Sequence, residues 1–458
     1  MTMPHRFRHT IRIACLFAAL STVAWTQDPP APDPERWNVF YQATSIGQYH
    51  GTFSSPYSSP YSLQAYPERD ASLTTTLFLG LRLAKNTTLY FDPEIAGGRG
   101  FSGVNGLANS SNGELPRVAS ATPKPYLARL YISQDFGFGG DEMESVESDE
   151  NQLGGQRPVN RYTITAGRFT LTDFFDNNKY SHDPRSQFIG WAVMFNGAWD
   201  YPADVRGYTW GWMHEIHTRH WSFRYASAAM PRVANGLRFD RRLFVNRGDV
   251  FEAERRYTIG GHAGTLRALN FENHANAGTY QQAINDVAQT KSVPDVISTR
   301  RNGTFKYGFG LNAEQEIAKD IGVFGRLGWN DGKTESFAFT AIDRLATIGV
   351  SVGGERWHRK FDVVASEMTV NGLSAVHRQY LALGGHDFLL GDGALNYGLE
   401  SIWESYYNAR LTPWLFITFD VQHIANPAYN RDRGPLVVPS ARVHMEFSKE
   451  TFASHPKH

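Results

Sequence analysis

The chain has a single cysteine among its 458 residues, no long hydrophobic run after its leader and no excess of charge of either sign. Cys15 lies within that leader, so the remainder can form no disulfide and offers no thiolate for catalysis or zinc. No later stretch approaches the roughly 18 apolar residues of a membrane-spanning helix. The 45 basic and 45 acidic residues provide no basic field to hold nucleic acid. Any membrane crossing must therefore be made by strands, because only helices and closed barrels satisfy their backbone groups in lipid.

The N-terminus has the order of charged and apolar regions that is typical of a secretory signal peptide. Arg6, Arg8 and Arg12 precede a short apolar run over 13–20. We expect a signal peptide at 1–26, a proline-rich periplasmic segment at 27–36, a barrel at 37–447 and a C-terminal tail at 448–458. Cleavage would remove three arginines and no acidic residue, so the mature chain would carry a formal charge of −3.

Segments of about ten residues in which apolar and polar side chains alternate recur along the rest of the chain. In the last of them, Arg442, His444 and Glu446 share one face and four apolar side chains share the other. An aromatic content of 14% and 42 glycines accompany this pattern, while the mean hydropathy is −0.41. The combination is typical of an all-β transmembrane antiparallel barrel with a polar interior.

We expect about sixteen strands. They lie at 37–44, 72–83, 87–96, 126–136, 161–169, 206–217, 221–229, 249–258, 264–273, 304–316, 321–331, 345–356, 361–370, 395–408, 414–424 and 438–447. In the segment 206–217, Tyr208, Trp210 and Trp212 are expected to face outward.

Parity supports this count, because an even-stranded barrel alternates short periplasmic turns with long outer loops. Connections such as 218–220 and 317–320 are short and fall in every second slot, and long ones such as 170–205 fall between them. The exception is 137–160, which parity places in the periplasm although it is long. Its acidic run at 141–150 is typical of a solvated excursion. The alternative is an error of the strand count at this point.

Two stretches carry a more specific signal. The first reads GRFTLTDFFDNN over 167–178, continues with DPR at 183–185 and QF at 187–188, and ends with NGAWDYPAD over 196–204. The second reads TPW at 412–414, NP at 426–427 and NRDRGP at 430–435. Both resemble the carbohydrate-selective porin family of bacterial outer membranes. The resemblance implies a sixteen-stranded barrel in the outer membrane of a Gram-negative-type bacterium, through which sugars diffuse. One departure is that Phe447, in the terminal strand, does not end the chain.

Strand facing also predicts which polar side chains line the lumen. The lumen-lining set is Arg82, Arg129, Glu215, Arg224, Glu254, Arg256, Glu314, Arg326, Asp420, Arg442 and Glu446. A phosphate pore would be expected to show a one-sided ladder of basic residues, so the mixture of signs favours uncharged solutes. The alternative is that these charges pair with one another and stiffen the wall.

The loop 170–205 is the expected constriction. Phe188, Trp191 and Phe195 recur at three- and four-residue spacing, which predicts a short helix with an apolar face. Folded inward, the loop would narrow the pore; the alternatives are a lid on the rim and a contact between subunits. The residues expected at the constriction or in contact with solute are Arg168, Asp173, Asn177, Asp183, Arg185 and Asp200. Arg168 follows the parity of the outward face, but its position at the rim allows either direction.

These features predict a channel for passive, sugar-preferring diffusion of small carbohydrates into the periplasm. The alternative is a general or organic-acid porin, because charge counts do not determine selectivity. A barrel enzyme would need a nucleophile beside its base, and no such set converges; no catalytic residue, cofactor or metal is expected. A closed adhesion barrel is disfavoured by the polar inward faces. The expected partners are small carbohydrates and outer-membrane lipid, with no nucleic acid; a homo-oligomer stays open.

Overall fold

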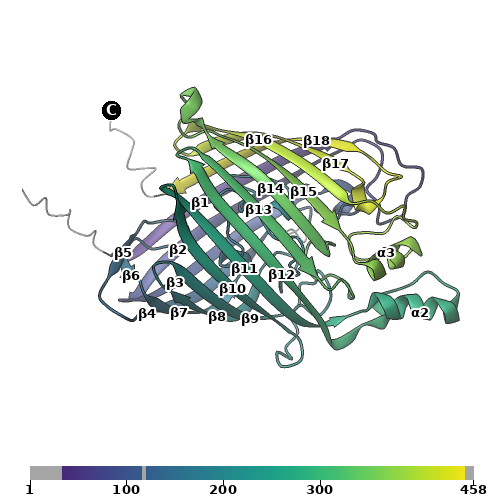
Figure 1. Ribbon diagram of the computed structural model, residues 1–458, viewed down its shortest axis with the longest axis horizontal. Coiled ribbons are helices and arrows are strands. Elements are labelled where there is room, and N and C mark those ends of the chain that lie inside the picture. The colour runs from purple at the N-terminus through teal and green to yellow at the C-terminus, as the bar shows by residue number, and fades with distance from the viewer. Residues whose placement is uncertain (1–33, 116–119, 449–458) are drawn as a thin grey trace, which may run out of the picture.

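The computed structural model describes residues 34–115 and 120–448. Sixteen strands form a closed antiparallel barrel in which β1 pairs with both β2 and β18 (Figure 1). This confirms the expected fold and the number of strands, and each expected segment overlaps an observed one. The expected signal peptide at 1–26, most of the segment 27–36 and the tail beyond Ser448 lie outside the described residues.

The elements follow the chain in order. The barrel strands are β1 (Trp37–His50), β2 (Glu68–Ala84), β3 (Thr87–Gly98), β4 (Lys124–Gly137), β7 (Arg161–Phe169), β8 (Thr209–His217), β9 (Trp221–Ala229), β10 (Arg247–Ile259), β11 (His262–Ala277), β12 (Arg301–Ala318), β13 (Ile321–Asn330), β14 (Arg344–Gly353), β15 (Val363–Gly372), β16 (Glu400–Thr412), β17 (Leu415–Ala425) and β18 (Leu436–Ser448). The helices are α1 (Trp191–Met194), α2 (Tyr280–Thr290) and α3 (Ala375–Ala382), with short 3-10 turns η1 (Phe101–Gly103), η2 (Leu171–Asp173), η3 (Ile297–Thr299), η4 (Gly354–Trp357) and η5 (Pro427–Tyr429). No helix in the described part of the chain is long and apolar enough to cross a membrane.

Successive side chains of each strand face opposite sides of the wall, as the two-residue period of a strand requires. In β2, Leu73 and Leu81 are exposed on the outside while Thr74 and Thr76 are buried on the inside. The expectation for Tyr208 is wrong. Because β8 begins at Thr209, Tyr208 belongs to the preceding loop and is fully buried, whereas Trp210 and Trp212 are exposed on the outer face.

The two ends of the barrel differ, as Figure 1 shows. Long loops carrying α2 and α3 project from one end, and most connections at the other end are short turns. In outer-membrane barrels the long loops are extracellular and the short turns periplasmic. The segment between β4 and β7 lies at the short-turn end, where it forms a two-stranded sheet of β5 (Met143–Val146) and β6 (Gly155–Pro158). It is therefore a real excursion at the end where parity places it, and the strand count is correct.

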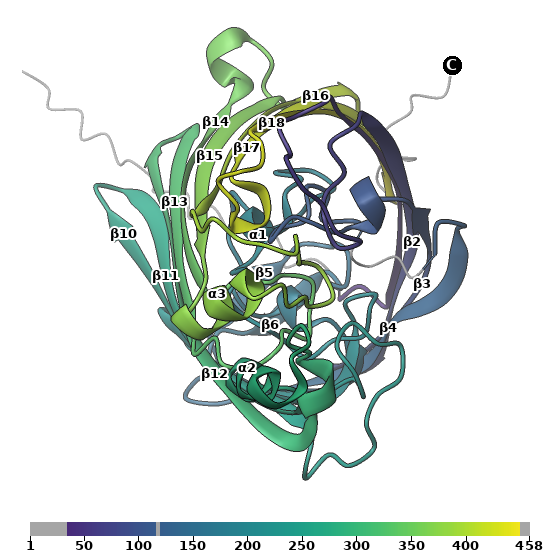
Figure 2. The ribbon, with the colours of Figure 1, turned by 90° about the vertical axis from the view of Figure 1, so that its right-hand side faces the viewer.

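The apolar core lies inside the barrel. Figure 2 looks into the end with the long loops and shows α1 surrounded by the strands. The expected helix is shorter than the apolar spacing suggests, because only 191–194 are helical. Phe188 packs on Phe324 of β13 and Tyr406 of β16, whereas Trp191 packs on Phe339. These aromatic side chains are buried against different surfaces, so tertiary contacts rather than helical periodicity set their spacing.

Candidate pore constriction

The loop 170–205 crosses the lumen and is held by strands spread around the barrel. Arg326 of β13 is fully buried and donates hydrogen bonds to Asp176, Ser181 and Val193 of the loop. Arg442 of β18 donates to the carbonyl oxygens of Pro184 and Gln187 at 2.8 and 2.6 Å. Across the lumen, Glu252 of β10 accepts the Asp176 N–H at 2.7 Å. The expected inward-folding loop is therefore confirmed.

Asp173 lies opposite Arg129 of β4, and the pair is bidentate. The Nε and Nη2 atoms of Arg129 donate to the two carboxylate oxygens of Asp173 at 2.6 and 2.7 Å. Nη1 donates to Asp92 of β3 at 3.3 Å. Asn177 stays in the same turn, since its Nδ2 donates to the Asp173 carbonyl at 3.1 Å. One arginine thus links two wall strands to the constriction loop through charge-assisted hydrogen bonds, which are stronger than neutral ones.

Arg185 makes a second buried ion-pair cluster. Its Nη2 lies 3.1 Å from Glu94 of β3, and its Nε lies 3.3 Å from Glu114 in the loop after η1. Burial alone would lower the pKa of Arg185, but the attraction of Glu114 and Glu94 raises it well above its ordinary value. Burial would raise the pKa of Asp183, but the nearby Arg185 charge lowers it. Both side chains are therefore charged at neutral pH.

Two further residues of the expected set have a structural role at the rim. Asp200 is buried; it accepts the Lys306 Nζ of β12 at 3.0 Å and the backbone N–H groups of Phe337 and Ala338. It therefore anchors the loop 331–343 and lines neither of the lumen cavities described below. Arg168 is also buried, and its Nη2 donates to Asp204 at 2.8 Å.

The backbone parity and the side chain of Arg168 point in different directions. In the sheet register it lies opposite Leu130 and Trp210, so its backbone keeps the outward parity. Its guanidinium group nevertheless turns over the rim, where Nε donates to the Leu127 carbonyl at 2.8 Å and the group lies 5.7 Å from the Tyr208 ring.

A ladder of ion pairs follows the inner wall from β8 to β12. Arg224 lies 3.1 Å from Glu215, 2.9 Å from Glu252 and 3.1 Å from Glu254. Glu254 also pairs with Arg256 at 2.5 Å and with Arg267 at 3.1 Å. Arg267 continues the ladder to Glu314 at 3.4 Å. The charges that the sequence places in the lumen are thus largely paired with one another.

The other expected lumen residues also lie on the inner side. Asp420 is 5% exposed. Glu446 is half-buried and lies 3.8 Å from His444. Arg82 donates to the carbonyl oxygens of Glu35 and Gly154 at 2.9 and 3.1 Å. Arg326 and Arg442, described above, complete this set.

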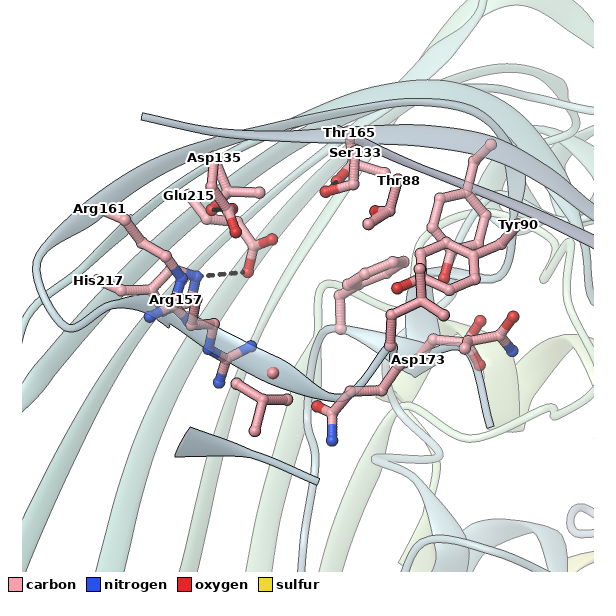
Figure 3. A pocket seen from close by; sticks show the side chains of 18 of the residues that line it. Thr88, Tyr90, Ser133, Asp135, Arg157, Arg161, Thr165, Asp173, Glu215 and His217 are labelled. Atoms are coloured by element: carbon pink, nitrogen blue, oxygen red, sulfur yellow. Dashed lines mark hydrogen bonds and ion pairs between the residues drawn. The ribbon is translucent and has the colours of Figure 1, made fainter. Parts of the chain in front are cut away.

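Two cavities lie between the constriction loop and the short-turn end. One has a volume of about 400 Å³; Figure 3 shows Arg157, Arg161 and His217 on one side of it and Tyr90 and Asp173 on the other. The second has a volume of about 590 Å³ and is lined by residues of the constriction loop, the β5–β6 segment and the wall. Its lining includes Arg129, Glu150, Asp183, Arg185, His444 and Glu446. Both volumes fall in the range of small-molecule sites.

Sequence reasoning missed several residues that shape this region. Glu114 lies in a long loop with no strand pattern, and Arg157 lies in the segment between β4 and β7, so neither could be assigned a facing. The alternation assigns Tyr208 to the outer face, but the side chain is buried and its hydroxyl donates to the Glu94 carboxylate at 3.4 Å. Tyr208 precedes the first residue of β8, and the alternation of facing applies only within a strand.

The fold and its interior define a class of protein: an outer-membrane channel of the porin type, with a closed barrel, a polar wall and an inserted constriction loop. The family model of the carbohydrate-selective porins, the OprB family, matches residues 71–447. The chain belongs to this family. Membership of the family implies a protein of the Gram-negative outer membrane and a channel rather than an enzyme.

A match to one solved structure agrees with this fold. The high-pH structure of Pseudomonas putida OprB is 15% identical with a TM-score of 0.67, and the match covers 90% of this chain and 94% of that chain. Pseudomonas aeruginosa OccK2 (OpdF) is 9% identical with a TM-score of 0.44, and the match covers 90% of this chain and 98% of that chain. No curated protein sequence matches the chain.

Proposed function

We propose that the channel passes small uncharged carbohydrates by passive diffusion into the periplasm and prefers them to organic acids and amino acids of similar size. The observation that carries this proposal is the mutual pairing of the lumen charges. Arg129, Arg185 and Arg224 each contact at least two carboxylates, so the interior offers many donors and acceptors without a one-sided field. A solute with several hydroxyl groups can exchange its water for such groups, whereas an ion gains little.

The membership of a carbohydrate-selective family supports the same substrate class. Binding must remain weak for a diffusion channel, because a solute that binds tightly does not leave. In this proposal Asp173, Asn177, Asp183 and Arg185 contact the sugar where they face the two cavities. The leader 1–26 would direct export, and the outer wall would contact lipid.

Liposome swelling with the purified, refolded protein tests the proposal. Glucose, a disaccharide, an amino acid and a small organic acid of matched size are compared, and heat-modifiable mobility in gels verifies that the barrel is folded. We expect the sugars to enter faster than the size-matched acid and amino acid. Rates that follow size alone would identify a general porin, and faster entry of the acid would identify an organic-acid porin.

A further inference from the structure

The segment between β4 and β7 is tied to the barrel mouth instead of projecting freely from it. Asn38 of β1 donates to Ser148 Oγ at 3.0 Å and to the Gln152 carbonyl at 2.8 Å. The Glu35 N–H donates to the Gly154 carbonyl at 3.0 Å, and the Gly154 N–H donates to the Glu35 carboxylate at 2.9 Å. We call residues 141–158 the periplasmic hairpin. Most of its acidic run is exposed, but its second half is fixed across the mouth.

The hairpin also buries an apolar side chain in the lumen. Leu153 is 5% exposed and belongs to the same cluster as Tyr90 and Tyr131 of the wall. Burial of a leucine side chain stabilises an attachment of this kind. Together with the hydrogen bonds, this anchor gives the hairpin a defined position beneath the constriction loop.

The hairpin forms one wall of the smaller cavity. Val146, Asn151, Gln152 and Arg157 line it from the hairpin, and Asp173 and Asn177 line it from the constriction loop. A solute that passes the loop on this side therefore meets the hairpin before it reaches the periplasm. The solute thus meets the constriction loop first and the hairpin second. Asp173 belongs to the constriction loop and also lines this cavity.

The charges around this cavity balance. Five arginines and three carboxylates line it, and a further arginine and three glutamates pair with them. The six basic residues are Arg82, Arg129, Arg157, Arg161, Arg224 and Arg256. The six acidic residues are Asp135, Glu144, Asp173, Glu215, Glu252 and Glu254. The cavity thus holds directed polar groups without net formal charge, a composition that suits an uncharged polyol better than an anion.

Aromatic rings complete the lining on the side away from Arg157 and Arg161. Tyr131 lies 5.0 Å from Tyr90 and 6.0 Å from Phe174, as measured between ring centroids. All three line the cavity, and Figure 3 shows Tyr90 on the side away from Arg157. The lining is mostly polar, and the three rings add an aromatic face to it.

We propose that the cavity between the periplasmic hairpin and the constriction loop is a second sugar subsite, which takes an uncharged monosaccharide after the constriction. Arg157 and Gln152 donate to its hydroxyl groups, and the Tyr90, Tyr131 and Phe174 wall covers its C–H face. The subsite rests on the proposed function, since it assumes that sugars use this pore. It assigns the hairpin a part in recognition that a simple turn could not play.

The test is a current measurement in planar bilayers with the full-length mature protein, in which a neutral hexose or the corresponding hexuronate is added on the side of the short turns. We expect the hexose to reduce the ion current with saturation, at lower concentrations than the hexuronate. Arg157→Gln should raise the half-saturating hexose concentration about tenfold, the effect of losing one hydrogen bond to a charged group. Glu147→Gln is the matched control on the same hairpin, because Glu147 is exposed and lines neither cavity; it should leave the value unchanged.

A second variant changes the position of the hairpin without changing a residue that lines the cavity. Asn38→Ala removes the side-chain hydrogen bonds from β1 to the hairpin, and Asn38 lines neither cavity, so the variant should raise both the half-saturating concentration and the conductance. Absence of saturation in the native protein, or native half-saturation in Arg157→Gln, would overturn the subsite. Liposome swelling separates this from the proposed function: a sugar preference that persists without saturable block removes the subsite and leaves the sugar channel in place.

Discussion

At the scale of single residues, Arg185 is the cation of a buried cluster of charges. Its side chain is 9% exposed, and its two partners Glu94 and Glu114 are 0% and 1% exposed. Arg185→Gln would remove the cation that the Glu94 and Glu114 carboxylates share, and breaking a buried ion pair costs about 3–5 kcal/mol. We expect lower stability and a shift towards cation permeation, measured as the reversal potential in a salt gradient.

Arg356→Gln is the matched control for this substitution. Arg356 pairs with Asp320 at the short-turn end, and its side chain is 53% exposed, so its loss should change stability by no more than about 1 kcal/mol. An unchanged reversal potential in Arg185→Gln would mean that the buried carboxylates do not face the permeation path.

His377 gives the long loops a pH dependence. This α3 residue is fully buried; its Nδ1 lies 3.1 Å from Asp343, its Nε2 lies 3.7 Å from Asp387, and the Tyr280 ring of α2 stacks on it at 4.2 Å. Burial would lower the pKa of His377, but the charge of Asp343, its hydrogen bond to the imidazole ring and the charge of Asp387 raise it to about 9 from an ordinary 6.5. His377 is therefore an imidazolium at neutral pH, and this clasp pairs α3 with Asp343 and Asp387 of the neighbouring loops.

The sign of the effect follows from linkage. A raised pKa means that the stabilisation is complete below about pH 6.5 and is lost as the pH rises through about 9. The pKa of Asp343 is lowered, so its contribution is lost only at acidic pH. We expect the loop 373–399 to become sensitive to protease between pH 7 and 9.5 in the native chain. In His377→Gln the sensitivity should be high and nearly independent of pH; equal resistance at both values in the native chain would contradict the clasp.

At the scale of elements, the constriction loop owes its position to the barrel wall more than to its own structure. Its one α-helix has four residues, whereas Arg326 alone supplies five hydrogen bonds to it. The Glu404 carboxylate of β16 accepts the Ile189 and Gly190 N–H groups. Arg326→Met should therefore weaken the attachment of the loop to β13 and leave Asp176 without the Arg326 cation.

We expect Arg326→Met to raise single-channel conductance and the size limit for neutral solutes, because a displaced loop no longer fills the lumen. Conductance is read in planar bilayers, and solute size in liposome swelling. Arg301→Met, at the exposed start of β12, is the control and should match the native channel. Native conductance in both variants would show that the remaining anchors suffice to hold the loop.

At the scale of the whole molecule, closure of the barrel depends on the seam between β1 and β18. Phe447 lies opposite Tyr41 in the register of that seam and stacks on Trp414 with ring centroids 5.4 Å apart. An open seam would expose a row of unpaired backbone groups to lipid, which is strongly unfavourable. Phe447→Ala should therefore reduce the yield of folded barrel and lower its unfolding temperature, both followed by heat-modifiable mobility.

Phe419→Ala on β17 is the control for the seam. Phe419 is 66% exposed on the outer face and pairs in register with Tyr407 and Ala441 rather than across the seam. It should assemble with a yield close to that of the native chain. Equal losses in both variants would indicate a general need for outward aromatic side chains rather than a role at closure.

The sequence by itself determined the class of fold, the number of strands and the facing of most of them. The physical reason is local: a strand with lipid on one side and water on the other must alternate apolar and polar side chains, and an even barrel must alternate its connections. The loop 170–205 could be predicted to fold into the barrel because its aromatic side chains must be buried against a surface.

Only the tertiary structure decided which charges meet and where the irregular segments lie. Arg185, Glu94 and Glu114 come from three separate parts of the chain and form one ion-pair cluster. Their spacing in the sequence does not predict this contact. Tyr208 turns inward because the strand begins one residue later, and the periplasmic hairpin returns to the mouth because Leu153 finds an apolar site there. Alternation fixes a side chain only while the chain is a strand; outside the strands, burial and pairing with distant groups decide.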